Sequence, residues 1–122
     1  GAVEFAVSDA SQNDAAQPAP GMLSRHYAPA TRLVVIGHNS PATAFAGLRC
    51  GLLTTGNQPF FGRFSRIESL SDDGNLQTCA ANFFAAMRTL DASDLDVIIA
   101  HEFPTYGLGV ALNDRLRRAA HQ

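Results

Sequence analysis

The chain has 122 residues, a hydrophobic fraction of 46% and a formal net charge of −2 at pH 7. This length and this apolar content suffice for one hydrophobic core but not for two. The nearly neutral charge leaves no electrostatic footprint for direct nucleic-acid binding, and no apolar stretch approaches the roughly 18 residues that cross a bilayer. A basic start followed by an apolar run is also absent, so we expect a cytoplasmic protein that makes no contact with a membrane.

The N-terminal region, residues 1–30, is predicted to be an irregular linker arm. Its first 20 residues are rich in small and polar side chains, and after Val7 they contain no large apolar side chain. Such a segment cannot offset the entropy that ordering it would cost. We therefore place the folded domain in residues 31–122.

The end of this arm, residues 19–29 with the sequence APGMLSRHYAP, is dense in groups that can contact a ligand, and we call it the strap. Arg25 offers a planar fork for carboxylate or phosphate, His26 a proton-exchanging ring and Tyr27 a hydroxyl on a flat apolar body. Two prolines bracket these residues and restrict the backbone on either side. The residues alone support two interpretations equally: a semi-rigid segment that presents its side chains to a neighbouring surface, or a linker whose Met22 and Tyr27 only pack on this domain.

Four short apolar segments predict strands. Residues 31–37 and 96–100 are continuous, β-branched runs, which are typical of strands covered on both faces. Residues 50–56 predict a further strand that glycine ends. Residues 64–70 alternate apolar and polar side chains, so we expect this strand nearer an edge of the sheet.

Two helices are predicted. Residues 76–90 place apolar side chains at three- and four-residue steps, and Asn75 stands where an N-cap is needed. Residues 107–120 form the last helix, in which Asp114 and Arg118 can pair across one turn. The inward stripes comprise Leu76, Cys79, Ala80, Phe83, Met87 and Leu90 in the first helix and Leu108, Leu112 and Leu116 in the second.

The linking segments are less regular. Residues 38–48 begin with a Ser-Pro pair and small residues, which favour a short helix or an irregular crossover. Phe60 and Phe61 are expected to fold back onto the core. Strands alternating with helices predict an α/β domain with a parallel or mostly parallel sheet, flanked by helices in a complete or partial three-layer arrangement.

Cysteine and arginine usage adds little chemistry. Cys50 and Cys79 lie in apolar settings without metal-ligand spacing, which predicts buried thiols and no disulfide. Arg115, Arg117 and Arg118 are expected to form the solvated face and favourable last turn of the final helix.

A secondary candidate ligand edge involves His38, His101 and Glu102. These residues follow two predicted strands, so they could meet at the carboxyl edge of the sheet, where α/β domains usually bind ligands. Their spacing is not that of a known metal motif, and we predict no metal. Gly107 and Gly109 open the last helix, where free N–H groups could meet an anion, but the third glycine of a dinucleotide fingerprint is missing. A tight strand-to-helix turn explains them more simply.

Three motifs carry a resemblance to a known family. They are PGMLSRHYAP at residues 20–29, NFFAAMRTLD at residues 82–91 and GLGVALNDRLRRAA at residues 107–120. In order and spacing they resemble the linker and C-terminal domain of the long form of threonylcarbamoyl-AMP synthase. The resemblance covers roughly residues 19–120, although Leu23 and Ser24 depart from the commoner strap of the family.

The resemblance implies a Rossmann-like C-terminal domain and a linker that folds across the catalytic cavity of a YrdC-like domain. That domain would bind ATP, threonine and bicarbonate and form threonylcarbamoyl-AMP and pyrophosphate for tRNA modification. ATP and Mg²⁺ would therefore belong to the complete enzyme, and this chain would hold no cofactor and no catalytic residue. Met22, Arg25, His26 and Tyr27 would cover the substrate, with Tyr27 and His26 nearest to it.

The YrdC-like domain is not among these 122 residues, so we expect a separate piece whose main partner is the YrdC-like domain of the same polypeptide. Two other hypotheses stay open. The domain could be an independent small-ligand or regulatory binder that uses the edge near His38, His101 and Gly107. It could also be a protein-interaction module for the tRNA-modifying machinery or for a second copy of itself, as in a homodimer.

Overall fold

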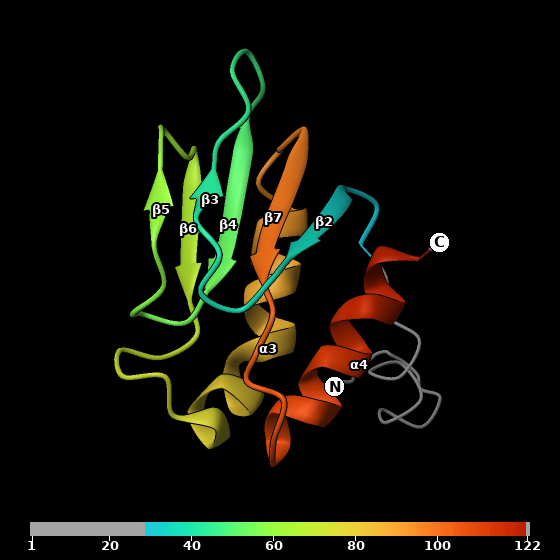
Figure 1. Cartoon of the computed structure of the whole chain (residues 1–122). Helices are drawn as coiled ribbons and strands as arrows, with labels where there is room; N and C mark the ends of the chain where they lie inside the picture. Colours follow the sequence, from blue (N-terminus) through green and yellow to red (C-terminus); the bar gives the residue numbers. More distant parts are fainter. Residues whose placement is uncertain (1–28, 122) are drawn as a thin grey trace, which may run out of the picture.

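The computed structural model describes residues 29–121, and its centre is a four-stranded parallel sheet (Figure 1). The strand order is β2-β7-β4-β6, so consecutive strands of the chain are not always neighbours. The two inner strands are fully buried, whereas the two outer ones are partly exposed. The strands are β2 (Arg32–Ile36), β4 (Cys50–Thr54), β6 (Arg66–Ser69) and β7 (Val97–His101).

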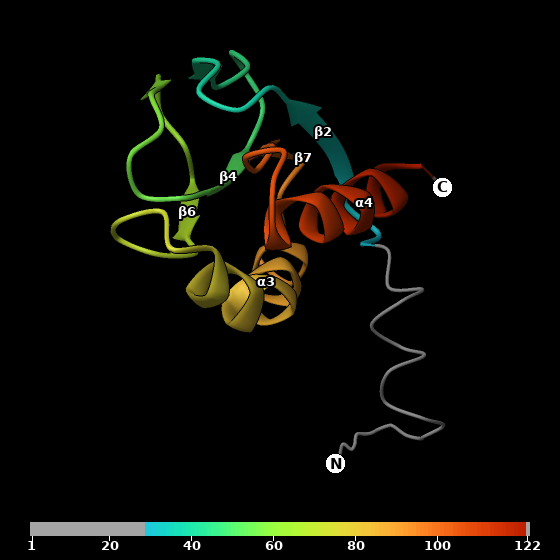
Figure 2. The ribbon, with the colours of Figure 1, turned by 60° about the horizontal axis from the view of Figure 1, so that its bottom comes forward.

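Two helices, α3 (Leu76–Asp91) and α4 (Leu108–Ala120), lie side by side on one face of this sheet (Figures 1 and 2). The Asn75 side chain caps α3 by accepting a hydrogen bond from the Thr78 amide at 3.0 Å, which confirms the predicted cap. The core between helices and sheet is continuous and apolar. Its largest members include Phe83, Phe103, Leu53, Leu70, Met87, Leu90, Ile98 and Leu116.

The opposite face is covered by the two segments that link β2 to β4 and β4 to β6 (Figure 2). Each contains a very short strand, β3 (Ala42–Thr43) and β5 (Phe60–Phe61), and these pair in parallel. Beneath them lies a small second core of Ala42, Leu52 and Ile99. The α/β class and the parallel sheet are therefore confirmed, with helices on one face and an irregular crossover on the other.

Two predicted burials are wrong. Strand β2 is at the edge and pairs with β7 alone in the sheet, so only Leu33 of this strand is fully buried. A continuous apolar run occurs in both edge and central strands. The composition of the run therefore does not reveal how many neighbouring strands it pairs with. Phe60 and Phe61 stay on the surface with 42% and 59% of their area exposed, because they belong to the outer layer rather than the core.

The inward face of α4 also differs from the prediction, because Leu108 is 43% exposed. Steps of four residues drift around a helix of 3.6 residues per turn by about 40° each, so Leu108, Leu112 and Leu116 cannot all face the core centre. Gly109 takes the inner position instead. A Cβ atom on Gly109 would overlap with the Pro104 carbonyl oxygen, so only glycine lets the helix start this close to the preceding loop.

Candidate functional site

The strap residues predicted to contact substrate, Met22, Arg25, His26 and Tyr27, lie outside the residues that the structure describes. Their role therefore stays a prediction. The last strap residue, Pro29, is described and is among the largest fully buried side chains. The strap thus ends on the domain at a buried proline, whose ring also fixes the backbone φ angle there.

The two residues after Pro29 are held by one carboxylate, that of Asp91 at the end of α3. The Thr31 amide donates to Asp91 Oδ1 at 2.9 Å, and the Thr31 hydroxyl donates to the same oxygen at 2.8 Å. The Ala30 amide donates to Asp91 Oδ2 at 3.3 Å. We call Pro29, Ala30, Thr31 and Asp91 the junction. It lies at the amino end of β2, where the chain enters the sheet.

The opposite, carboxyl edge of the sheet holds His101, which is the last residue of β7 and is only 2% exposed. Its Nε2 lies 2.7 Å from the Ser40 carbonyl oxygen, and its Nδ1 lies 2.9 Å from the Thr54 hydroxyl. Because a carbonyl oxygen can only accept, we assign the proton to Nε2 and the accepting role to Nδ1. Both ring nitrogens are thus used to join β7 to β4 and to the crossover after β2.

Burial lowers the pKa of His101 below its ordinary value of about 6.5, although the carbonyls of Ser40 and Pro59 partly oppose this by favouring the charged ring. The nearby His38 also lowers it. His101 is therefore neutral at pH 7. Its geometry is that of a residue that ties three segments of the domain together.

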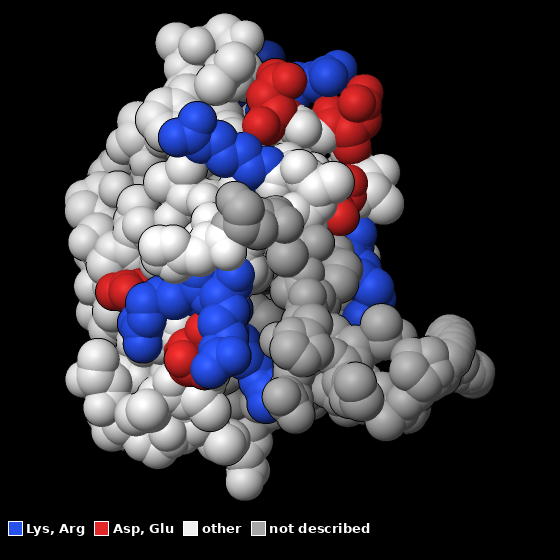
Figure 3. All heavy atoms as spheres, turned by 90° about the vertical axis from the view of Figure 1, so that its right-hand side faces the viewer, with Lys and Arg blue, Asp and Glu red and all other residues white. Residues whose placement is uncertain are grey.

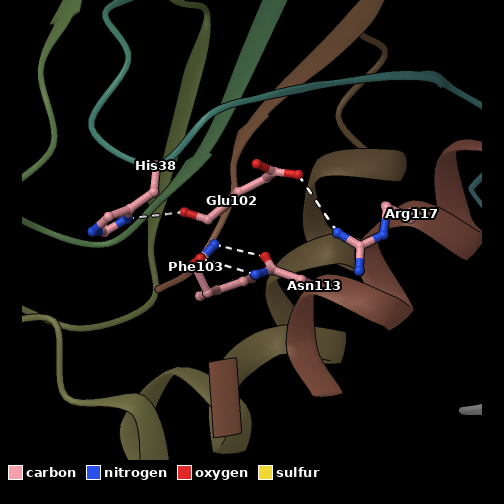
Figure 4. A network of polar contacts seen from close by, with 5 residues as sticks. All are labelled: His38, Glu102, Phe103, Asn113 and Arg117. Atoms are coloured by element: carbon pink, nitrogen blue, oxygen red, sulfur yellow. Dashed lines mark hydrogen bonds and ion pairs between the residues drawn. The ribbon is translucent and has the colours of Figure 1, made fainter. Parts of the chain in front are cut away.

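His38 and Glu102 do come together at this edge, but through the main chain (Figure 4). His38 Nδ1 lies 3.1 Å from the Glu102 carbonyl oxygen, while the Glu102 carboxylate turns to Arg117 of α4 at 3.6 Å. The three residues predicted to share a ligand thus point to different partners. Among the residues that the structure describes, no three side chains of His, Cys, Asp or Glu gather in a way that could hold a metal ion.

Asn113 of α4 is the polar residue that sequence reasoning missed at this edge (Figure 4). It is 3% exposed, and its side chain makes two hydrogen bonds to the backbone of Phe103. The Phe103 amide donates to Asn113 Oδ1 at 2.7 Å, and Asn113 Nδ2 donates to the Phe103 carbonyl at 2.9 Å. This pairing supplies hydrogen-bond partners to backbone groups of a buried loop residue that lies outside the strands and helices. Its sequence signal is an amide directly after Leu112, on the buried stripe of the helix.

Gly107 and Gly109 form the tight turn into α4. Gly107 has a φ of 54° with a ψ of −137°, and the Gly109 amide donates to the Tyr106 carbonyl at 2.9 Å. The Val110 amide donates to the Gly107 carbonyl at 3.2 Å. These two amides are thus already bonded within the turn, which leaves a close helix approach as the role that the geometry supports.

The arginine cluster of α4 lies next to acidic side chains (Figure 3). Arg118 donates to Asp114 at 2.9 Å, as predicted, and Arg117 pairs with Glu102. Arg115 lies over the Phe84 ring, 5.8 Å from its centroid. The expected solvated helix face is confirmed.

Both cysteines, Cys50 and Cys79, are free and buried. Burial raises the pKa of the Cys79 thiol, although a hydrogen bond to Ser71 opposes this. A thiol of this kind stays protonated and unreactive at neutral pH. Within residues 29–121, no helix has the length and apolar run of a membrane span.

Comparison with known proteins gives a consistent result. The family model described as "Threonylcarbamoyl-AMP synthase, C-terminal domain" matches residues 2–121. A threonylcarbamoyl-AMP synthase of Bacillus subtilis is 34% identical over 108 residues, which is 83% of this chain and 31% of the relative. One of Pyrococcus abyssi is 29% identical over 115 residues, covering 84% of this chain and 32% of the relative.

A solved structure agrees with these sequence matches. The crystal structure of P. abyssi Sua5 complexed with L-threonine is similar with a TM-score of 0.60 and 26% identity, over 79% of this chain and 30% of that one. The chain thus spans about a third of the length of the relatives that it matches.

Proposed function

Because this chain belongs to the family of threonylcarbamoyl-AMP synthase C-terminal domains, we propose that it is the accessory domain and active-site-covering linker of an L-threonylcarbamoyladenylate synthase. The proposed reaction converts ATP, L-threonine and bicarbonate into threonylcarbamoyl-AMP, pyrophosphate and water. The product would supply the threonylcarbamoyl group for tRNA modification.

In this proposal the reacting groups bind a YrdC-like catalytic domain that precedes this chain in the same polypeptide. ATP and Mg²⁺ would bind that domain. The residues described in this chain include no cluster of His, Cys, Asp or Glu suited to a metal. The strap would supply the contacts to substrate, through Arg25, His26 and Tyr27, and the folded body would anchor the strap.

These separate roles of strap and body rest on one observation. Polar groups at the carboxyl edge are hydrogen-bonded within the domain itself. Both ring nitrogens of His101 and the side-chain Oδ1 and Nδ2 atoms of Asn113 are bonded within the domain. A residue that binds substrate needs a polar atom directed toward the ligand, whereas these atoms are directed toward groups of the domain itself. His101 and Asn113 therefore support a structural role at this edge, and we propose the strap as the segment whose side chains contact the ligand.

A covering strap has a clear chemical purpose in this reaction. Threonylcarbamoyl-AMP is a mixed anhydride, so water in the site would hydrolyse it before it is used. A segment that closes over a nucleotide site excludes water and holds the reactants in place. We propose that the strap has this role.

Two tyrosines allow a direct test of the proposal. In the full-length protein, Tyr27→Ala should lower the rate of threonylcarbamoyl-AMP formation by about tenfold or more, because it removes a contact from the covered site. Tyr106→Ala is the matched control, since Tyr106 is 68% exposed on the body and its removal should leave the rate unchanged. Equal rates for wild type and Tyr27→Ala would remove the strap from the mechanism.

A further inference from the structure

At the junction, several hydrogen bonds from the chain entering the sheet converge on one side chain, that of Asp91. Both oxygens of Asp91 are used, and their donors include two main-chain amides and one hydroxyl from Ala30 and Thr31. These residues are about 60 positions apart in sequence, so the contact joins the end of α3 to the start of the domain. Hydrogen bonds to a carboxylate are stronger and more directional than those between neutral groups.

Asp91 is placed where it does not help its own helix. It is the last residue of α3, and a carboxylate there faces the negative end of the helix dipole. Helix stability therefore does not explain an acidic residue at this position. The donors of Ala30 and Thr31 give Asp91 a role outside its helix, because they gain a charged acceptor.

Pro29 restricts the course of the backbone next to this contact. Its side chain is fully buried, and the two residues after it are held by Asp91, so the position and the backbone direction of the chain are both set at this point. Tyr27 is two residues earlier in the sequence, and two residues span at most about 7 Å. A displacement of Pro29 therefore moves the point from which Tyr27 must reach its contact.

We infer that Asp91 is a positioning residue: it holds Ala30 and Thr31 and so sets the point from which the strap reaches the active site. This inference rests on the proposed function and deepens it, because it names the group of the folded body through which the body acts on the reaction. Asp91 touches no substrate in this account. Its effect passes through Pro29 to the strap.

The first part of the test measures whether Asp91 holds the junction, and it needs only this chain. In Asp91→Ala the Thr31 amide should exchange with solvent at least about tenfold faster than in wild type, because its charged acceptor is lost. The amides of the central strand β4 should keep their protection, which shows that the variant is folded. Unchanged exchange at Thr31 would overturn the inference.

The second part measures positioning in the full-length protein, as the ratio of free AMP to threonylcarbamoyl-AMP formed from ATP. A misplaced strap admits water, which splits the mixed anhydride to AMP, so Asp91→Ala should raise this ratio by about tenfold or more. A loss of folded protein would lower both products together and leave the ratio unchanged. Faster exchange at Thr31 with an unchanged ratio would therefore also overturn the inference.

Matched variants separate the junction from general effects of charge and packing. Asp94→Asn removes a carboxylate near the same helix end and keeps a residue type that tolerates its φ of 56°, so both readouts should stay at wild-type values. Thr31→Val removes only the hydroxyl donor and should give a smaller rise in the ratio, whereas Thr31→Ser should restore the wild-type value. A wild-type protein that forms no threonylcarbamoyl-AMP would contradict the proposed function, while the exchange measurement would still decide whether Asp91 holds the junction.

Discussion

The carboxyl edge and the junction use polar residues in opposite ways. At the carboxyl edge, His101 and Asn113 are buried and bind backbone and side-chain groups of the domain itself. At the junction, Asp91 binds the two residues through which the chain arrives from the strap. At the edge where α/β folds usually bind ligands, His101 and Asn113 therefore join parts of the domain, and the junction is the region that we link to the reaction.

From this comparison we expect substitutions at the carboxyl edge to lower the stability of the domain strongly but to have no specific effect on the reaction. The largest is expected for Gly109→Ala. A new Cβ would overlap with the Pro104 carbonyl oxygen, so α4 must shift, and we expect the free energy of unfolding to fall by about 3 kcal/mol. Chemical denaturation would measure it. Val110→Ala, at the next and exposed position, should change it by less than about 0.5 kcal/mol, and equal effects would contradict the close approach.

Asn113→Leu should have the next largest effect. The leucine keeps the volume roughly, but it leaves the Phe103 amide and carbonyl buried without their partner. We expect a loss of about 2 to 3 kcal/mol of unfolding free energy by denaturant titration. A variant as stable as wild type would show that water or another group satisfies Phe103, and the carboxyl edge would then be less tightly built than described.

His101→Gln tests the same edge through pH. Because the pKa of His101 is lowered in the folded state, the unfolded chain binds more protons as pH falls below about 6.5, and the wild type loses stability there. Above that pH its full contribution is present. A glutamine side chain cannot take up this proton, so the variant should cost about 1 to 2 kcal/mol at pH 7.5 and less at pH 5. A constant difference between the two pH values would show that His101 does not carry this dependence.

Thr31→Val should have the smallest effect on stability. It removes one hydroxyl donor to Asp91 at a partly exposed site, so the unfolding free energy should fall by only about 1 kcal/mol. Thermal melts of this chain would measure the change, with Thr31→Ser as the control that keeps the hydroxyl. A loss as large as that of Asn113→Leu would remove the contrast between the two regions, because the junction would then be part of the structural core.

Local patterns predicted the elements well, because periodicity and caps depend on neighbouring residues. The stripe of α3 and its Asn75 cap are seen as expected, and the alternating strand β6 is at an edge. The edge position of β2 could not be predicted, because strand order depends on contacts between distant segments. Composition alone does not contain that information.

The polar sites show the same limit. His38 and His101 were expected at one edge because both follow strands, and they do lie there, but their bonds to main-chain atoms of Glu102 and Ser40 depend on loop geometry. Asp91 is the last residue of the NFFAAMRTLD motif, but nothing in the sequence indicated its contact with Ala30 and Thr31, because an acidic residue at a helix end looks like ordinary surface. Its partner Thr31 is 60 positions away, and only the folded structure brings the two together.

The central claim is that the folded body anchors the strap and binds no substrate tightly by itself. Isothermal titration of this chain with ATP, alone and with L-threonine, tests it most directly. We predict no heat of tight binding in either titration, and unchanged heats in His101→Gln. A sub-micromolar dissociation constant for ATP or L-threonine that His101→Gln abolishes would place a ligand site in the body and contradict the account.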